Sequence, residues 1–331
     1  LHEVSGAVLR TRWVADKPSD GLTLVANRYH VHEEPVREGV VAQTFLLEDD
    51  GRLRATYMER TRVYLEMYEE MIGPYPYGKF ATVENWFPTG YGMPSYTLLG
   101  GQVLRLPFIP YTSFGHQICH NWWGNSVFVD LEDGNWCEGL TVYCADYHYK
   151  KLESDEAARE YRRNLLKDYA AYVTDPDKDF PLSEFKSRHS GASRAVGYGK
   201  SMMVFHMIDR LVGRAGFQAG LRAVAAEHQF TAAGWSDFMD SFEAAGGVEL
   251  DDFAVQWLTR RGAPELVLES PEFEESRVTF TLVQGEPLFD LQVPVVVTTP
   301  AGPVEHILDL EGASRKVEIE GTGITSVAVD P

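Results

Sequence analysis

The sequence predicts an α+β protein in which a mostly helical middle lies between two β-rich ends. Apolar and polar residues alternate over residues 1 to about 50, which is the period of half-buried strands. From about 105 to 260, apolar residues recur at helical spacing instead. Beyond 266 the alternation returns in short runs punctuated by Gly, Pro and Asp, as expected for a small β-sandwich. We therefore predict three domains or parts of domains, at 1–52, 53–262 and 263–331.

Individual elements follow from the same patterns. The Asp50–Gly51 pair is typical of a turn, and the helical spacing of 52–71 predicts a helix that ends at the Gly- and Pro-rich GPYPYG. The run KFATVENWF at 79–87 predicts a strand. Further helices are predicted at 154–172 and 199–212. The strands predicted in the last part are 266–270, 277–284, 291–299, 305–310 and 325–330.

Composition and charge exclude several classes of protein. The chain has 331 residues, with 30 Lys and Arg against 49 Asp and Glu, and a net charge of −19. A surface this negative repels phosphate backbones, so we expect no nucleic-acid partner. No run of about 18 apolar residues occurs, so we expect no membrane span. Because the chain begins at Leu1 without a signal peptide, we interpret it as a piece of a longer protein, and its localisation and oligomeric state stay open.

The candidate chemistry is concentrated in residues 115–139. His116 and His120 are four residues apart, so on a helix their imidazoles project from one face and can share a metal ion. Two unrelated surface or core histidines are the alternative, because this spacing also arises by chance. Glu138 begins a further helical segment and would complete a set of two His and one Glu, which leaves a catalytic zinc ion one open position. The alternative role for Glu138 is an acid that stabilises a helix N-terminus.

The three cysteines are expected to be buried thiols rather than ligands or disulfides. An odd count argues against a disulfide framework, and Cys119, Cys137 and Cys144 all lie close to the candidate site. Cys119 is about 100° round the helix from His120, so it should face away from the metal. Cys137 precedes Glu138 and is likewise expected to point elsewhere.

This segment resembles the M1 family of zinc aminopeptidases, in which His-Glu-x-x-His is followed by a Trp-, Gly- and Asn-containing helix end and then by Glu-Gly. The corresponding residues here are His116-Gln117-Ile118-Cys119-His120, Trp122-Trp123-Gly124-Asn125 and Glu138-Gly139, with the helix expected to end at Gly124–Asn125. The resemblance continues in GPYPYGKFATVE at 73–84, RAVGYGKSMMVFHMI at 194–208 and FAVQWLTRRGAPEL at 253–266.

The resemblance implies a thermolysin-like catalytic domain at 53–262, with the end of a β domain before it and a small β-sandwich after it. It implies one zinc ion held by His116, His120 and Glu138, and a peptide substrate. It also assigns to Tyr198 the phenol that hydrogen-bonds the oxyanion of the tetrahedral intermediate, where a donor stabilises developing charge. A core aromatic residue at a helix start is the alternative role for Tyr198.

Gln117 departs from the family pattern at the position of the general base. The family's Glu takes a proton from the attacking water and passes it to the leaving amine, whereas a glutamine amide cannot accept that proton. We therefore expect zinc binding to persist and peptide hydrolysis to be largely lost. An engineered Glu→Gln substitution and a natural pseudopeptidase both account for Gln117, and the retained ligands and Tyr198 favour the former.

The segment YGMPSYTLLGG at 91–101 departs from the family's Gly-Ala-Met-Glu-Asn strand, whose Glu binds the free amine of a peptide. Alignment on Met93 places Pro94 at that Glu and Ser95 at the Asn. Charge recognition of an N-terminus is therefore expected to be weak, although Gly92, Met93, Pro94 and Ser95 are still expected to line the substrate cleft. The acids considered as substitutes are Glu84, Glu132 and Asp133.

Four residues near the candidate site have less specific patterns. His206 is expected to be a hydrogen-bonded core histidine, and His148 to have a surface or outer-sphere role. Arg194 and Lys200 flank Tyr198 and are candidates for contacting a substrate carboxylate. Solvated surface charges are the default expectation for both.

These observations favour a zinc metallopeptidase of M1 type that acts on peptides, with this chain inactive or crippled through Gln117. The alternative from another class is a non-catalytic, zinc-containing module that binds peptides or a partner in the same cleft. A third interpretation is a hydrolase that uses the zinc on a non-peptide substrate, as one branch of the family does with an epoxide. Restoring Glu at position 117 and screening substrates separates the three.

Overall fold

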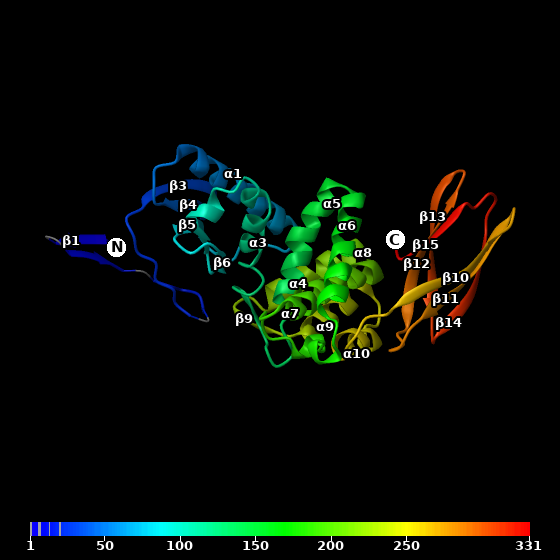
Figure 1. Ribbon diagram of the computed structural model, residues 1–331. Coiled ribbons are helices and arrows are strands. Elements are labelled where there is room, and N and C mark those ends of the chain that lie inside the picture. Colours follow the sequence, from blue (N-terminus) through cyan, green and yellow to red (C-terminus); the bar gives the residue numbers. More distant parts are fainter. Residues whose placement is uncertain (1, 6–7, 13, 20) are drawn as a thin grey trace. The chain divides into compact units, whose positions relative to one another are not determined.

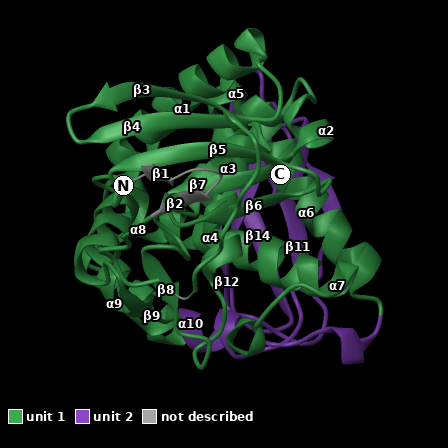
Figure 2. Ribbon diagram, turned by 90° about the vertical axis from the view of Figure 1, so that its left-hand side faces the viewer, with its two compact units in different colours: residues 1–174, 182–252 green, residues 175–181, 253–331 purple. Residues whose placement is uncertain are grey.

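The computed structural model describes residues 2–5, 8–12, 14–19 and 21–331. Its helices and sheets confirm the α+β class. The chain divides into two compact units, shown in separate colours in Figure 2. The first unit comprises 1–174 and 182–252 and carries the candidate site, and the second comprises 175–181 and 253–331 and consists mostly of strands.

The N-terminal stretch contains two antiparallel strand pairs. β1 (His2–Ser5) pairs with β2 (Val8–Thr11), and β3 (His30–Arg37) pairs with β4 (Val40–Leu46). The described residues between β2 and β3 form no strand, so the prediction of strands throughout 1–50 was right only in part. Positions 1, 6, 7, 13 and 20 of that prediction lie outside the described residues.

A five-stranded mixed sheet in the order β3-β4-β5-β7-β6 forms one part of the first unit (Figure 1). β5 (Lys79–Asn85) confirms the strand predicted from KFATVENWF, and it runs parallel to both β4 and β7 (Tyr96–Gly100). β6 (Gly90–Met93) pairs antiparallel with β7 and lies at the edge of the sheet. The segment predicted to line the substrate cleft is thus an edge strand and the turn that follows it.

Helix α1 (Gly51–Met71) confirms the helix predicted at 52–71 and packs against β4 and α3. Its N-cap is Asp50, whose carboxylate accepts hydrogen bonds from the backbone N–H groups of Arg52 at 3.1 Å and Leu53 at 2.9 Å. The prediction of a turn at Asp50–Gly51 was therefore wrong. An Asp carboxylate satisfies backbone donors equally well in a turn and at a helix start, so the residue type alone does not separate them.

Helices dominate the rest of the first unit, as the sequence predicted. The helices predicted at 154–172 and 199–212 are present, and the second ends at a kink at Gly213, whose φ is 73°, before a further helical stretch completes α8. A short parallel pair, β8 (Val127–Val129) and β9 (Thr231–Ala233), accompanies them. Within the described residues, the helices lack the combination of length and apolarity that crossing a membrane needs. The helices are α2 (Gly101–Leu104), α3 (Ser113–Cys119), α4 (Cys137–Val142), α5 (His148–Glu153), α6 (Asp155–Tyr172), α7 (Gly191–Arg194), α8 (Ser201–Glu227), α9 (Trp235–Gly246) and α10 (Asp251–Leu258).

Aromatic packing fixes where α4 begins. Trp136 immediately precedes α4 and is fully buried, and its ring N–H donates to the carbonyl oxygen of Ala233 at 2.7 Å. The centroid of its ring lies 4.6 Å from that of Phe238 on α9 and 6.0 Å from that of Trp123. Large aromatic side chains contribute much of the burial energy of a core, so this contact ties the start of α4 to the segment that follows α3.

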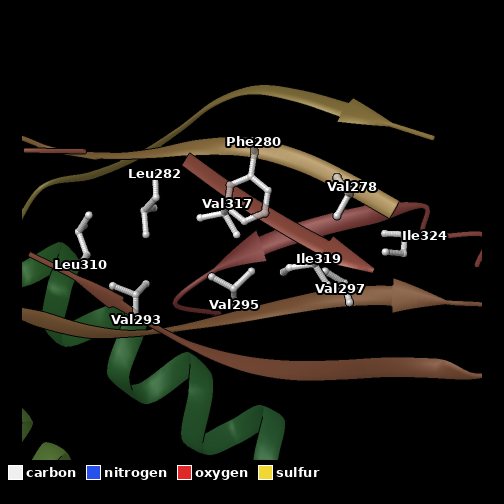
Figure 3. Packing of buried hydrophobic residues seen from close by; sticks show 10 residues of the cluster. All are labelled: Val278, Phe280, Leu282, Val293, Val295, Val297, Leu310, Val317, Ile319 and Ile324. Atoms are coloured by element: carbon white, nitrogen blue, oxygen red, sulfur yellow. The ribbon is translucent and has the colours of Figure 1, made fainter. Parts of the chain in front are cut away.

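The second unit contains two three-stranded antiparallel sheets, in the orders β10-β11-β14 and β13-β12-β15. Side chains from both sheets meet in one apolar cluster (Figure 3). β14 was not predicted, because only Val317 and Ile319 of its seven residues face the core and the others are exposed. The strands are β10 (Leu266–Phe273), β11 (Arg277–Gln284), β12 (Leu291–Thr299), β13 (Gly302–Leu310), β14 (Ser314–Glu320) and β15 (Ser326–Val329).

His206 lies in the helical core, but it lacks the hydrogen bond expected of it. Its Nδ1 atom is buried without a hydrogen-bond partner among the described residues. The ring packs edge-on against Tyr147 at 5.5 Å between centroids. Burial is the main cause that lowers the pKa of His206 to about 3. The positive charges of Arg162, Arg210 and Lys151 act in the same direction. Burial and the Arg214 charge lower the pKa of His148 to about 4.

These two histidines predict a loss of stability in mild acid. Each has a depressed pKa in the folded state, so between pH 6.5 and about 4 the unfolded chain binds more protons than the folded one. Their stabilising contribution is complete above pH 6.5 and falls as the pH drops, by roughly 2 kcal/mol per histidine between pH 7 and 5. Urea unfolding followed by tryptophan fluorescence at the two pH values measures this loss.

The matched comparison is His206→Gln against His30→Gln, since His30 is exposed. We expect the His206→Gln chain to lose less stability between pH 7 and 5 than the unsubstituted chain, and the His30→Gln chain to lose the same amount. Equal losses in all three chains would contradict the assignment of acid sensitivity to His206.

Candidate metal centre

Three side chains from two helices converge in the first unit. His116 lies on α3, His120 is the C-cap residue that directly follows α3, and Glu138 lies in the first turn of α4. The Nε2 atoms of the two histidines are 3.2 Å apart, and the Glu138 Oε2 atom is 3.6 Å from each of them. All three side chains are largely buried, and their three ligand atoms lie within 4.8 Å of one another. Two imidazole nitrogens and one carboxylate oxygen at these separations fit a single zinc-sized cation.

Helix α3 is shorter than the sequence predicted. It ends at Cys119, with His120 still in right-handed helical conformation, rather than at Gly124–Asn125. The chain then turns through Gly124, which has a positive φ of 99°. A Cβ atom at Gly124 would lie 2.9 Å from the Cys137 sulfur. Glycine at this position therefore lets the start of α4 come close to the end of α3.

The outer nitrogen of each histidine ring is held by a partner. His116 Nδ1 donates to Asp146 Oδ2 at 2.6 Å, and His120 Nδ1 donates to the carbonyl oxygen of Trp123 at 3.0 Å. With the proton on Nδ1, the lone pair of each ring is on Nε2 and faces Glu138. Such partners fix the tautomer and the orientation of metal-binding histidines.

Asp146 was missed by the sequence reasoning. It follows Glu138 by eight residues, which on a regular α-helix would turn it by about 80° from Glu138, whereas seven residues would give about 20°. Residues Tyr143–Tyr147 form a π-helical turn, which accommodates one extra residue. Asp146 therefore takes the direction that the seventh residue would have and faces His116. No pattern of residue types announces such a turn, so helical spacing alone pointed Asp146 away from the site.

The charges of the cluster reinforce one another. Burial alone would lower the pKa of His116, but the charges and hydrogen bonds of Asp146 and Glu138 outweigh it and raise the pKa to about 10. Burial likewise opposes the effects of Cys137 and Glu138 on His120, whose pKa is also raised to about 10. Burial would raise the pKa of Glu138, but the two histidines hold it below its usual range. A cation that binds here competes with protons, so its affinity is expected to fall as the pH falls.

The cysteines are buried and free, as predicted. Cys119 packs in the core beside Cys144, away from the Nε2 atoms. Cys137 is closer to the site than expected, because its sulfur lies 3.6 Å from His120 Nδ1 and 3.2 Å from the carbonyl oxygen of Trp123. It thus contacts the outer side of His120 rather than the side that faces Glu138.

Strand β6 lies directly against helix α3. A Cβ atom at Gly92 would lie 3.0 Å from Gln117 Oε1 and 3.1 Å from His120 Cβ. Gln117 is partly buried, and its side-chain oxygen lies close to β6 at Gly92. Of the residues predicted to line the cleft, Gly92 is therefore the one with a described contact to the site.

Met93, Pro94 and Ser95 lead into and form the turn between β6 and β7. Met93 pairs with Tyr96 and packs against a small apolar cluster. Ser95 has a positive φ of 68°, and its backbone N–H donates to Asn121 Oδ1 at 2.8 Å. The Lys79 ammonium donates to Ser95 Oγ at 2.8 Å. The polar contacts of this turn thus come from an amide and an ammonium group.

The acids considered as substitutes for the amine-binding Glu are engaged or exposed. The Glu84 carboxylate accepts hydrogen bonds from the Arg105 guanidinium at 2.5 Å and from the backbone of Leu47 at 2.9 Å. Asp133 accepts hydrogen bonds from the backbone and hydroxyl of Ser236 at the start of α9. Glu132 is exposed.

Tyr198 lies in a second π-helical turn, Ala195–Lys200, between α7 and α8. Burial, and then the charge and a hydrogen bond of Glu138, raise the pKa of Tyr198. Its phenol is therefore close to the cluster and remains protonated at neutral pH. The two flanking cations have other surroundings: Arg194 is exposed and pairs with Asp168 at 3.3 Å, whereas Lys200 is buried, so the expectation of a solvated surface charge is wrong for Lys200.

Comparison with known proteins shows what this part of the chain is similar to. Residues 112–257 match the model of the peptidase family M1 domain. The chain is 29% identical to aminopeptidase N of Haemophilus influenzae over 177 residues, which are 52% of this chain and 20% of that protein. It is 28% identical to aminopeptidase N of Escherichia coli over 182 residues, which are 52% of this chain and 20% of that protein. It is 24% identical to probable aminopeptidase 1 of Sulfurisphaera tokodaii over 236 residues, which are 65% of this chain and 29% of that protein.

Residues 112–257 are thus similar to the domain of a peptidase family, M1. The relatives that match the chain are aminopeptidases. The chain spans between 20% and 29% of the length of these three relatives. The matched residues 112–257 include all three members of the His–His–Glu cluster together with Gln117 and Tyr198.

The contact between His116 and Asp146 generates a prediction about metal affinity. Asp146→Asn removes the charge that holds the His116 proton on Nδ1, and loss of such a partner weakens zinc binding by about 10- to 100-fold. Competition with a zinc chelator at pH 7.5 measures the affinity. Asp240→Asn, at an exposed position on α9, is the matched loss of one negative charge and should leave it unchanged. Equal zinc affinity in the Asp146→Asn and unsubstituted chains would remove the role assigned to Asp146.

Proposed function

We propose that this chain carries the catalytic region of an M1-type zinc peptidase, with peptide hydrolysis weakened by Gln117. The observation that carries the proposal is the convergence of His116, His120 and Glu138 inside the region that matches the M1 domain. M1 enzymes are generally zinc-dependent, and the three ligand atoms with their fixed tautomers suit one zinc ion. Bound there, zinc would supply Lewis-acid chemistry, polarising a carbonyl group and making water a better nucleophile at neutral pH.

The proposal also covers the finer architecture. We assign 53–262 to a thermolysin-like catalytic domain, 1–52 to the end of a preceding β domain and 263–331 to a small β-sandwich. The apolar cluster shared by the two sheets of the second unit supports the last assignment. The convergence of α3 and α4 on one His–His–Glu cluster supports the first.

Gln117 is the residue that is expected to lower the rate of peptide hydrolysis by this chain. It occupies the helical turn between the two histidines, where a general base would be within reach of the attacking water. Its amide cannot take the proton, and general acid–base catalysis is worth typically ~10²–10⁴ in rate. Tyr198 keeps its own role, because burial and the nearby Glu138 raise the pKa of its phenol, which stays protonated and is a donor for negative charge that develops on a substrate carbonyl.

Strand β6 is the element on which a peptide is expected to lie. As an edge strand it has one row of backbone N–H and C=O groups without a strand partner among the described residues, and an extended peptide can add to such an edge. The close contact of Gly92 with Gln117 and His120 brings such a peptide to the metal centre. Pro94 and Ser95 offer no carboxylate at the turn, so we expect a free N-terminal amine to contribute little to binding.

A zinc-containing module that binds peptides without cleaving them is the second candidate, and Gln117 is the observation that favours it. The metal ligands, their outer partners and the edge strand do not depend on a base at position 117. Binding of a peptide is therefore expected in both cases, and only the restored base separates them.

The test is the metal content and peptidase activity of this chain and of Gln117→Glu. We expect both to bind one zinc ion and the Gln117→Glu chain to cleave peptides about 10²–10⁴ times faster. Gln117→Glu combined with His116→Ala is the control and should lose both stoichiometric zinc and activity. Two zinc-loaded chains that both leave every peptide uncleaved would overturn the peptidase proposal and favour the binding module, unless the Gln117→Glu chain acts on non-peptide substrates.

A further inference from the structure

A pocket of about 760 Å³ lies beside α7 in the first unit, and its lining is rich in positive charge. Two of its lining side chains are guanidinium groups and a third is an imidazole. This is unusual in a chain of net charge −19. The lining residues are Tyr172, Arg188, His189, Ser190, Gly191 and Arg194.

The two arginines of this pocket differ in their partners. Arg194 pairs with Asp168 at 3.3 Å. Arg188 is exposed and makes neither a hydrogen bond nor an ion pair with any residue that the structure describes. The Ser190 hydroxyl is engaged in capping α7 by accepting from the backbone N–H of Ser193. Arg188 is thus the charged group of the pocket that remains available to a ligand.

The segment that carries Arg188 is anchored beside the metal centre. Asn135, three residues before Glu138, donates from its backbone N–H to the carbonyl oxygen of Phe185 at 2.8 Å and from its side chain to that of Lys186 at 2.8 Å. The ring of Phe185 lies 6.4 Å from the ring of Tyr198. A short stretch of chain therefore links both Glu138 and Tyr198 to Arg188.

We propose that this pocket binds a carboxylate of a peptide held at the metal centre, with Arg188 as its charged contact. The inference rests on the proposed function and adds a substrate class to it: peptides with an acidic side chain or a free C-terminal carboxylate on the Tyr198 side of the site. A guanidinium presents a planar fork of donors that matches a carboxylate, and among the described residues Arg188 has no partner that a substrate would have to displace.

Because the Gln117 amide is expected to slow peptide cleavage, the binding of peptides can be measured on the unsubstituted chain. The probes are fluorescent polyalanine peptides that carry one Glu, whose position differs from peptide to peptide. Each is compared with the same peptide carrying Gln in place of Glu. Every peptide is made both with a free and with an amidated C-terminus. Fluorescence anisotropy on the zinc-loaded chain gives Kd. We expect the best carboxylate peptide to bind about 3- to 10-fold more tightly than its amide counterpart, and this advantage to shrink at high salt.

Substitutions test whether Arg188 causes the tighter binding of carboxylate peptides. Arg188→Gln should abolish this advantage over the amide peptides, and Arg188→Lys should keep part of it. Arg163→Gln is the matched control, because Arg163 is exposed and lies nine residues from Tyr172 on α6, about 180° round that helix. Arg163→Gln should leave the advantage unchanged. An equal loss in the Arg188→Gln and Arg163→Gln chains would overturn the inference, since it would show a general effect of net charge.

The remaining outcomes separate this inference from the proposed function. A Glu–Gln difference identifies an acidic side chain as the ligand, and a difference between free and amidated peptides identifies the C-terminus; both support the pocket. Equal Kd values for all pairs, with peptide cleavage by the Gln117→Glu chain, overturn the carboxylate site and leave the peptidase proposal intact. Neither binding nor cleavage of any peptide overturns both.

Discussion

The close approach of α4 to its neighbours is the constraint on which the site depends. A methyl group at Gly139 would overlap the hydroxyl of Ser201 on α8, and one at Gly124 would press on the Cys137 sulfur. These two glycines let α4 pack against both α8 and the end of α3. Glu138, next to Gly139, is thereby carried between two imidazoles. Burying a carboxylate is costly unless it is paired, so the histidines and the packing around α4 support one another.

Two π-helical turns adapt this packing to the chemistry. The turn at Tyr143–Tyr147 follows α4 and brings Asp146 to His116, while the turn at Ala195–Lys200 carries Tyr198 toward Glu138. A regular helix in either place would direct these side chains elsewhere. Such widened turns are rare in proteins, and they occur frequently at functional sites. Here one turn places Asp146 against His116, and the other carries Tyr198, whose proposed role is to donate to charge that develops beside the metal.

The sequence revealed those features that depend on local spacing and not those that depend on a distant contact. His116 and His120 are four residues apart on one helix, and their pairing with Glu138 follows from a single motif. Asp146 escaped prediction because a π-helical turn changes its direction, and Arg188 because its importance depends on what surrounds it. β14 escaped because its outward residues are charged, although Val317 and Ile319 complete an apolar core. Asp50 was misassigned because a turn and a helix start need the same acceptor.

On the proposed function, different residues would hold the metal and the peptide from those that would cleave the peptide. The ligands are oriented by Asp146 and by the Trp123 carbonyl, neither of which involves position 117. Gln117 contacts β6 at Gly92 and has nearly the volume of Glu, so the strand is held at the same distance with either residue. A glutamate there would add a negative charge near Glu138 and Asp146, and the amide avoids that repulsion. In the proposed peptidase, an amide at position 117 would remove proton transfer while leaving the proposed metal ligands and the edge strand in place, and such a chain would retain a bound peptide.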